Sequence, residues 1–279
     1  MSRALRPSEA PLAGLRRILT AELDEARDAL HRGRLSDRRV HDVRKELKRA
    51  RANLRLLRGA LGDAAYHRAN RLLRDAARPL TPLRDAKVLA DLLAERIERT
   101  PSKGTARPYT QLRRRLDRSR RRLRVRLPAA VAAADPKLRA VRARVRALPT
   151  SGGRPGELAL RLADTYRKAR RAFVRAEARP DDEKLHEWRK QVKYLLAQLE
   201  VLKTVKPRHT RKLAKRADRL ADLLGADHDL AVLEQKLGPR AKSLERDRAR
   251  LQREAHRIGQ RLHRDSPRRF ARPYEKRLR

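Results

Sequence analysis

The stretch Val40-His-Asp-Val-Arg-Lys-Glu-Leu-Lys48 nearly matches Leu185-His-Glu-Trp-Arg-Lys-Gln-Val-Lys193 in the other half of the chain. Each stretch places a histidine, an arginine and a lysine at positions i, i+3 and i+7, beside apolar residues with similar spacing. On an α-helix this spacing produces one cationic stripe next to one buried stripe. The repeated pattern therefore predicts two helices with ordered cationic faces, which is typical of a shaped site for a polyanion.

The first of these helices carries a long cationic stripe beside its apolar seam. The seam advances in steps of three and four residues and consists of Val40, Val43, Leu47, Ala50, Leu54 and Leu57. The cationic residues follow one position later, about 100° around the helix, and are His41, Arg44, Lys48, Arg51, Arg55 and Arg58. They border the core, so their aliphatic stems can pack against it. Lys45 lies farther round the helix, toward solvent.

The second helix repeats the plan with a shorter stripe. Its seam consists of Leu185, Trp188, Val192, Leu195, Leu199 and Leu202. Its stripe begins with His186, Arg189 and Lys193, but Leu196 and Glu200 then stand where the first copy has arginines. If the stripes form two walls of one site, we expect the first wall to carry more of the binding.

Composition narrows the choice of partners. The chain has 279 residues and a formal net charge of +42, from 76 basic and 34 acidic residues. Repulsion between so many positive charges destabilises the compact state unless a polyanion neutralises them. The expected partner is therefore nucleic acid, polyphosphate or an anionic lipid surface. Most of the basic residues are arginine, which binds phosphate bidentately, although genomic base composition alone can also enrich arginine.

Other classes of protein are excluded or disfavoured by the same composition. There is no cysteine, which excludes disulfides, thiolate catalysis and cysteine-type zinc sites. The N-terminus lacks the apolar region of a signal peptide, and no apolar run approaches membrane-spanning length. We therefore expect a cytoplasmic protein that does not insert into membranes.

The expected fold class is all-α. Apolar residues make up 39% of the chain and aromatic residues 3%, and a helical period recurs almost throughout. The predicted helices cover roughly 9–31, 37–58, 64–78, 83–99, 108–127, 136–147, 157–178, 182–204, 208–224, 227–237 and 240–264. A Gly/Ser/Pro-rich linker at 149–156 separates an N-terminal helical half, 8–148, from a C-terminal half, 157–264. The basic tail, 265–279, is expected to be poorly ordered.

A second pair of matching segments relates the two halves. Leu83-Arg-Asp-Ala-Lys-Val-Leu89 matches Asp227-His-Asp-Leu-Ala-Val-Leu233, which aligns Asp85 with Asp229. The order and the separation agree with those of the first pair, so we interpret the chain as a tandem duplication that forms two pseudo-symmetric helical bundles. The two aspartates are expected to orient basic residues or to cap a helix.

The helices that follow each stripe carry further cations at positions i, i+3 and i+7. These cations are Arg71, Arg74 and Arg78 in the first half and Lys212, Lys215 and Arg219 in the second. They can form the facing wall of a channel, or simply a solvated helix face. The histidines of both stripes lie near helix starts, where an anion is favoured. Each can donate to a phosphate oxygen or, alternatively, bond to a neighbouring carboxylate or carbonyl.

These residues resemble the CHAD family, the conserved histidine α-helical domain. The resemblance covers approximately residues 8–264 and rests on both His-x-x-Arg-x-x-x-Lys helices, on Arg84-Asp85-Ala-Lys-Val-Leu and on Leu224-Gly-Ala-Asp-His-Asp229-Leu-Ala-Val-Leu. It implies two helical bundles packed around a basic central cavity that binds inorganic polyphosphate, association with polyphosphate granules, and no catalysis. One departure is Leu196-Ala197, where the family often has Arg-Tyr.

The resulting hypothesis is a noncatalytic polyphosphate-binding module without cofactor or metal. The candidate binding residues are His41, Arg44, Lys45, Lys48, Arg51, Arg55, Arg71, Arg74, Arg78, His186, Arg189, Lys190, Lys193, Lys212, Lys215 and Arg219. An enzyme is disfavoured because no Walker loop, nucleophile elbow or His-Glu-x-x-His motif occurs. Nonspecific nucleic-acid binding is the stronger alternative, since the arginine-dense segment 113–124 can grip phosphates. A lipid-surface role is weaker, because the apolar faces are narrow.

Overall fold

The computed structural model describes residues 3–33, 35–100, 102–150, 156–238 and 242–278, and these residues contain helices and no strand. The N-terminal half contains α1 (Pro11–His31), α2 (Asp37–Leu54), α3 (Arg58–Leu61), α4 (Asp63–Ala77), the 3-10 turn η1 (Arg78–Leu80), α5 (Thr81–Glu98), α6 (Lys103–Val125) and α7 (Leu127–Arg146). The C-terminal half contains α8 (Glu157–Ala178), α9 (Asp182–Val201), α10 (Pro207–Leu237), α11 (Lys242–Leu262) and α12 (Pro267–Glu275). The predicted all-α class is confirmed.

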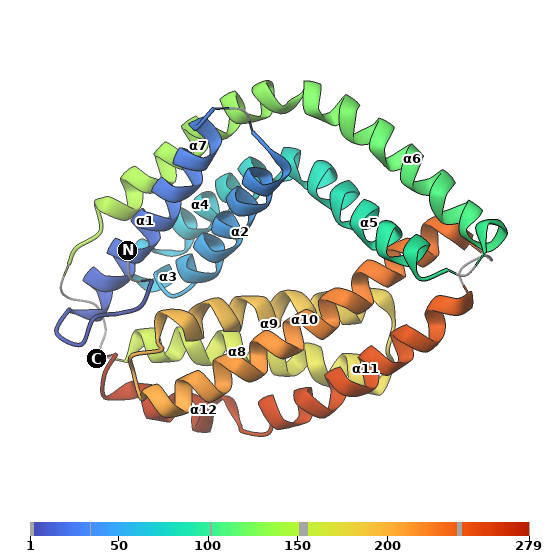
Figure 1. Ribbon diagram of the computed structural model, residues 1–279. Helices are drawn as coiled ribbons and strands as arrows, with labels where there is room; N and C mark the ends of the chain where they lie inside the picture. The colour runs from blue at the N-terminus through green and yellow to red at the C-terminus, as the bar shows by residue number, and fades with distance from the viewer. Residues whose placement is uncertain (1–2, 34, 101, 151–155, 239–241, 279) are drawn as a thin grey trace.

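In the N-terminal half, α2 packs on α1 and α4, and α7 packs on the same two helices to complete a bundle (Figure 1). Its predicted seam is confirmed, because Val40, Val43 and Leu47 are all 0% exposed. The helix starts after Ser36, whose hydroxyl accepts a hydrogen bond from the backbone N–H of Arg39 at 3.3 Å. This cap satisfies one of the free donors of the first turn.

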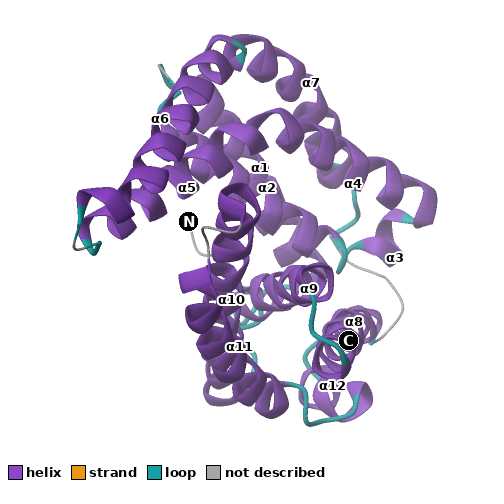
Figure 2. Ribbon diagram, turned by 90° about the vertical axis from the view of Figure 1, so that its right-hand side faces the viewer, coloured by secondary structure: helices purple, strands orange, loops and turns teal. Residues whose placement is uncertain are grey.

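In the C-terminal half, α9 lies between α8 and α10, and α11 and α12 cover the outer sides of these helices (Figures 1 and 2). Trp188, Val192 and Leu195 of its predicted seam are 0% exposed. The carboxylate of Asp181 caps α9 by accepting the Lys184 backbone N–H at 2.8 Å. The two stripe helices thus have the same construction, with a polar cap followed by a buried seam.

Several predicted helix boundaries are wrong, and the helix predicted at 37–58 already ends at Leu54. The segments 208–224 and 227–237 form the single 31-residue helix α10, which runs through Gly225 without a break. A glycine lowers helix propensity but does not by itself end a helix. The segment from Pro136 onward is likewise part of α7, which begins at Leu127 and contains this proline.

The C-terminal tail is ordered, contrary to expectation. It forms α12, whose Phe270 ring stacks on Tyr166 of α8 at a centroid distance of 3.9 Å. Tyr274, one turn later, is 0% exposed, and its hydroxyl lies 3.1 Å from Thr210 Oγ1. The spacing of these two aromatic residues gives a short basic helix enough apolar surface to dock.

The two halves meet at two junctions. At the first, α2 packs on α9, and the Gln198 side chain donates a buried hydrogen bond to the Ala52 carbonyl at 2.8 Å. At the second, the far end of α10 approaches α5 and α6 (Figure 1). There Arg96 of α5 forms an ion pair with Asp247 of α11. A separate apolar cluster fills this junction and consists of Ala86, Leu89, Leu93, Leu116, Leu230, Leu233, Leu237 and Leu244.

Candidate functional site

Cations from α2, α5 and α9 gather beside the first junction. Lys48 interacts electrostatically with Arg44 of its own helix, with Arg189 and Lys193 of α9, and with Arg84 of α5. We call these five residues the central cationic cluster. The two predicted stripes therefore face one region, which the sequence alone left open.

Arg44 is held in this cluster by the start of α5. Its side chain is buried, at 8% exposure, and donates a hydrogen bond to the Thr81 hydroxyl. Its nearest carboxylate is Asp85, at 4.0 Å, and its Nε atom is buried without a hydrogen-bond partner. Burial lowers the pKa of Arg44, opposed by Asp85. The guanidinium remains charged, and Asp85, the Thr81 hydroxyl and the Ala77 carbonyl compensate its burial only in part.

Arg189 occupies the corresponding place in the second half. It is 9% exposed and lies against Gly225 of α10, where a Cβ atom would stand 3.5 Å from the Arg189 Nε atom. Burial lowers its pKa, and Asp229 opposes this effect. Its Nε atom is also buried without a partner. Arg44 and Arg189 are thus alike, because each is a buried guanidinium whose Nε–H makes no hydrogen bond.

The two lysines of the cluster have strongly lowered pKa values. Burial and the neighbouring cations, Arg44 foremost, lower the pKa of Lys48 to about 7. The pKa of Lys193 falls to about 8 through burial, Arg189 and Arg84, although Asp222 and Asp229 oppose the shift. Lys48 still reaches solvent along part of its side chain. Burial is the larger cause for both lysines, and repulsion from the neighbouring cations adds to it.

Two carboxylates accompany the cluster. Asp85 lies 3.6 Å from Arg84 and near Arg44, and Asp229 interacts with Arg189, Arg84 and Lys193. Burial raises the pKa of Asp229 even though these cations lower it. The expectation that both aspartates orient basic residues is consistent with these contacts, and they leave the cluster with net positive charge.

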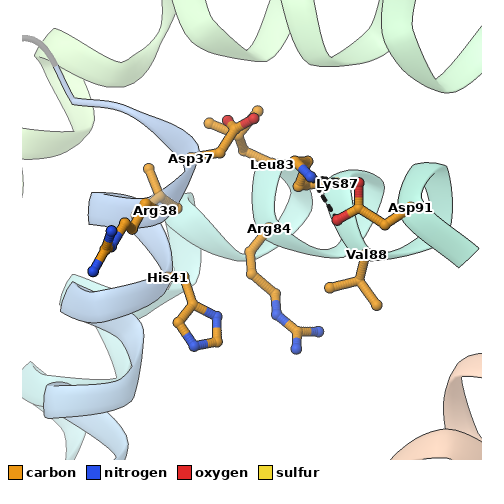
Figure 3. Close-up of a pocket in the computed structure, with 9 residues that line it drawn as sticks. Asp37, Arg38, His41, Leu83, Arg84, Lys87, Val88 and Asp91 are labelled. Atoms are coloured by element: carbon orange, nitrogen blue, oxygen red, sulfur yellow. Dashed lines mark hydrogen bonds and ion pairs between the residues drawn. The ribbon is translucent and has the colours of Figure 1, made fainter.

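His41 borders a cavity of about 250 Å³ between the start of α2 and the start of α5. Figure 3 shows His41 and Arg84 extending into the same space from their two helices. Burial, followed by Arg84, lowers the pKa of His41. Among the described residues His41 accepts or donates no hydrogen bond, so the alternative of a histidine bonded to a carboxylate or carbonyl is not what the structure shows.

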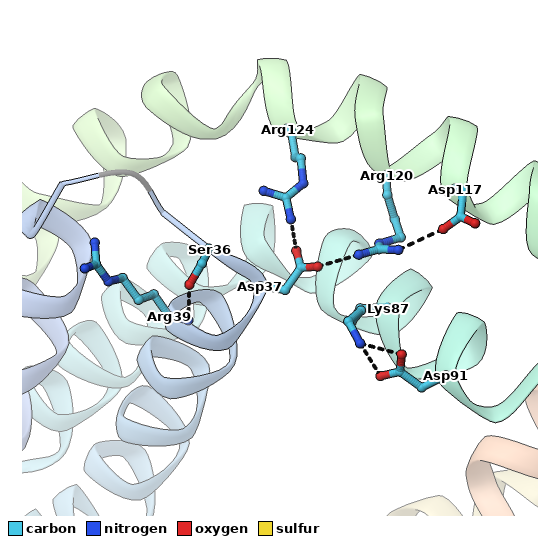
Figure 4. Close-up of polar contacts among 8 residues, drawn as sticks. All are labelled: Ser36, Asp37, Arg39, Lys87, Asp91, Asp117, Arg120 and Arg124. Atoms are coloured by element: carbon cyan, nitrogen blue, oxygen red, sulfur yellow. Dashed lines mark hydrogen bonds and ion pairs between the residues drawn. The ribbon is translucent and has the colours of Figure 1, made fainter. Parts of the chain in front are cut away.

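The start of α2 beside this cavity is fixed by α6. Arg120 and Arg124 of α6 both form ion pairs with Asp37, and Arg120 also contacts Asp117 at 2.8 Å (Figure 4). On the α5 side, Lys87 forms an ion pair with Asp91. Part of the arginine-dense segment therefore has a structural role, whereas Arg121 and Arg122 remain exposed.

His186 lies against His228, which is not among the predicted site residues. Its ring lies 4.7 Å from that of His228, between centroids, and burial and His228 lower its pKa. Burial and Arg189 likewise lower the pKa of His228. Both histidines stand next to Arg189 and can supply neutral donors to a bound anion.

Several predicted residues lie outside the cluster. Arg51 donates to Asn70 of α4 at 3.0 Å, and the Arg55 guanidinium lies over the Tyr194 ring at 3.9 Å. Lys190 forms an ion pair with Glu187, as Arg74 does with Asp75. Arg219 bonds Glu254 of α11 at 2.8 Å, on the side of α10 that faces α11.

The expected facing wall is therefore only partly assembled. Among the described residues, no hydrogen bond or ion pair joins Arg71, Arg74 or Arg78 to the cluster; Arg71 and Arg78 are exposed, like Lys45, Lys212 and Lys215. Lys215 lies two helical turns before Asp222, on the same face of α10. Asp222 interacts electrostatically with Lys193 of the cluster. The side chains that α5 and α10 contribute beside Arg189 are instead Arg84 and the neutral His228.

Arg84, His228, Thr81 and Gly225 belong to the candidate site but are not among the residues predicted from the sequence. Their signal was present, because Arg84 and His228 immediately precede the two matched aspartates. Thr81 and Gly225 lie one helical turn before the same aspartates. Thr81 accepts a hydrogen bond from Arg44, and Gly225 leaves room for Arg189. A single sequence does not show which side chains make such contacts between helices.

Comparison with known proteins identifies the family of the chain. A family model described as the CHAD domain matches residues 14–238. The chain belongs to the CHAD family. Its fold is similar to the crystal structure of the CHAD domain from the plant Ricinus communis, with a TM-score of 0.65 and 18% identity over 100% of this chain and 96% of that one. No curated protein matches the chain.

The matched motifs of this CHAD chain lie on α2 and α9, which pack on each other, and on α5 and α10, which also contact each other. Among the described residues of this CHAD chain, no three His, Cys, Asp or Glu side chains are grouped as metal ligands. No helix within the described ranges is both long and apolar enough to cross a bilayer.

Proposed function

We propose that this CHAD chain binds inorganic polyphosphate at the central cationic cluster without transforming it. The observation that carries the proposal is the convergence of two buried arginines and two lysines from α2 and α9, with Arg84 from α5. Each arginine keeps a buried donor unused. Phosphate oxygens would accept charge-assisted hydrogen bonds from these groups and relieve their mutual repulsion.

The form of the site favours a slender polyanion over nucleic acid. Arg44 and Arg189 are at least nine-tenths buried, so a ligand must bring its charges close to the helices. A polyphosphate chain carries a charge on every unit and has no bases to accommodate. Recognition of single-stranded nucleic acid usually involves aromatic stacking, and aromatic residues are only 3% of the chain.

The other candidate residues contribute to binding at the edges of the cluster or from a distance. His41, His186 and His228 donate from the edges of the cluster. Lys215 extends the site along α10, whereas Arg51, Arg55, Arg71, Arg74, Arg78, Lys45, Lys190, Lys212 and Arg219 contribute long-range attraction. We further propose that polyphosphate binding brings the protein to polyphosphate granules, and that the aspartates of the site orient cations and do not perform acid–base catalysis.

A matched pair of charge reversals tests the site. Arg44→Glu with Arg189→Glu is expected to weaken binding of long-chain polyphosphate at least 100-fold at near-physiological salt. Arg121→Glu with Arg122→Glu, on the exposed face of α6, changes the net charge equally and should weaken it less than fivefold. Equal losses would show diffuse electrostatic binding and contradict the proposal. Since Arg44 and Arg189 are buried, Lys48→Gln with Lys193→Gln provides a milder variant, expected to weaken binding at least tenfold.

Competition tests the choice of ligand. Polyphosphate should displace single- and double-stranded nucleic acid from the wild-type chain at near-physiological salt. If nucleic acid competes equally or better, nonspecific nucleic-acid binding is the correct function. Granule association is tested separately, by comparing the cellular location of the wild type and the Arg44→Glu, Arg189→Glu variant in polyphosphate-accumulating cells.

A further inference from the structure

A second concave basic surface lies at the N-terminal end of α10, away from the cluster. It is a cavity of about 910 Å³, within the size range of small-molecule sites, and its walls come from three distant segments of the chain. These are Pro7 near the N-terminus, residues 204–209 around the start of α10, and residues 265–277 in and around α12. At about 1.5 Å per residue, His209 is roughly 24 Å along the helix from Gly225.

The walls of this terminal pocket are fixed by hydrogen bonds of their own. Thr204 Oγ1 donates to the Leu5 carbonyl at 2.6 Å, which ties the N-terminal segment to the α9–α10 connection. Arg277 donates to the Arg6 carbonyl at 3.0 Å, which ties the same segment to the end of α12. The Tyr166 hydroxyl donates to the Asp265 carbonyl at 2.9 Å. A concave surface built in this way is formed before a ligand arrives.

The charge in the terminal pocket is positive and largely uncompensated. Lys206, Arg272 and Lys276 are exposed and have no ion pair among the described residues. Arg269 has Asp265 at 3.4 Å, and Glu275 is the other acidic group in the lining. Apolar surface is also present, from Pro7, Val205 and Pro273. The pocket thus combines separate cations with a few apolar contacts.

We propose that the terminal pocket binds a compact anion of two or three linked phosphates, either as free oligophosphate or as the phosphate group of a nucleoside triphosphate. Three unpaired cations on one concave surface suit a ligand with several adjacent charges better than a single phosphate. The volume exceeds that of a bare oligophosphate, so the apolar wall leaves room for an organic group. This site is separate from the central cluster and does not depend on the proposed function.

The test removes charge without disturbing the walls. Lys206 is the one residue other than glycine with a positive φ, 49°, among the described residues, so Lys206→Gly removes a cation at a position that suits glycine. The pocket variant combines Lys206→Gly with Arg272→Ala and Lys276→Ala. The control combines Arg118→Ala, Arg121→Ala and Arg122→Ala on α6, which removes the same charge from exposed positions. Both sets are made in the Arg44→Glu, Arg189→Glu background, so that the central cluster does not contribute.

Binding of tripolyphosphate and of ATP is measured by calorimetry at near-physiological salt. We expect the pocket variant to lose at least tenfold in affinity and the control less than twofold. Equal affinities for tripolyphosphate and ATP would show that the pocket recognises only the phosphate chain. Tighter binding of ATP would show that it also contacts the nucleoside. Equal losses in pocket variant and control, or no loss in either, overturn the proposal. If the triple variant does not fold, Lys206→Gly alone should weaken binding at least threefold, and unchanged affinity would contradict the site.

Discussion

The Arg189 guanidinium lies against Gly225, and a Cβ atom at that position would stand 3.5 Å from the Arg189 Nε atom. This distance is ordinary van der Waals contact, so one methyl group fits and a larger side chain does not. Gly225 therefore lets a buried arginine of α9 approach the backbone of α10. Thr81 plays a different part at the matching place in α5, where its hydroxyl accepts a hydrogen bond from Arg44.

Substitutions at Gly225 should separate stability from binding. Gly225→Ala is expected to raise the free energy of unfolding by about 0.5–1 kcal/mol, because glycine is unfavourable within a helix, and to leave polyphosphate affinity within about twofold. Gly225→Leu should displace Arg189 and weaken polyphosphate binding at least tenfold. Urea unfolding and calorimetry measure the two effects. Equal affinity in both variants would show that the approach of Arg189 to α10 is not needed for binding.

Polyphosphate binding should weaken as pH rises from 6 to 9. In the free protein, Lys48 and Lys193 have pKa values of about 7 and about 8 and lose their charge in this range. A bound anion favours the charged lysines and raises both pKa values, so binding takes up protons. Dissociation constants at fixed ionic strength should increase by up to about tenfold per pH unit for each deprotonated lysine. Calorimetry in buffers with different ionisation enthalpies should show the same proton uptake.

Lys48→Arg provides the control, because arginine remains charged throughout this range. The variant should show a shallower pH dependence than the wild type while still binding at pH 6. An unchanged slope would mean that Lys48 does not titrate between pH 6 and 9, or that it lies outside the binding site.

Glu22 should make the fold less stable at alkaline pH. Its carboxyl group is buried beside Glu46 and bonds Asn53 at 2.8 Å, and burial raises its pKa to about 8. A raised carboxyl pKa contributes stability below the unfolded value, about 4.5, and that contribution is lost as pH rises to about 8. Glu22→Gln stays neutral, so its free energy of unfolding relative to the wild type should increase by more than about 1 kcal/mol between pH 5 and 9. A constant difference across this range would contradict the buried, protonated carboxyl.

The ordered C-terminal helix should contribute measurably to stability. Phe270 is 3% exposed and stacks on Tyr166, so Phe270→Ala is expected to reduce the free energy of unfolding by about 3–5 kcal/mol. Arg268→Ala, on the exposed side of the same helix, should change it by less than about 0.5 kcal/mol. Thermal and urea unfolding measure both. A small effect of Phe270→Ala would mean that α12 does not remain docked in solution.

Local sequence patterns predicted much of the fold. The buried seams were predicted correctly, because apolar residues spaced three or four positions apart all lie on one face of a helix. That face is buried whichever helix packs against it. The break within α10 was wrong because Gly225 has low helix propensity, and the close approach of Arg189 that explains this glycine is a long-range contact. The tail was misjudged because charge dominated its composition, whereas Phe270 and Tyr274 determine how it packs.

The sequence by itself determined that two helices carry matched cationic stripes beside buried seams, since side-chain direction on a helix follows from residue spacing alone. The interpretation as a tandem duplication rests on that same sequence match. Only the tertiary structure decided that both stripes meet at one cluster, that Arg84 joins it from α5, and that Arg219 turns to Glu254. Such relationships depend on how helices cross, which is set by packing between residues far apart in the chain.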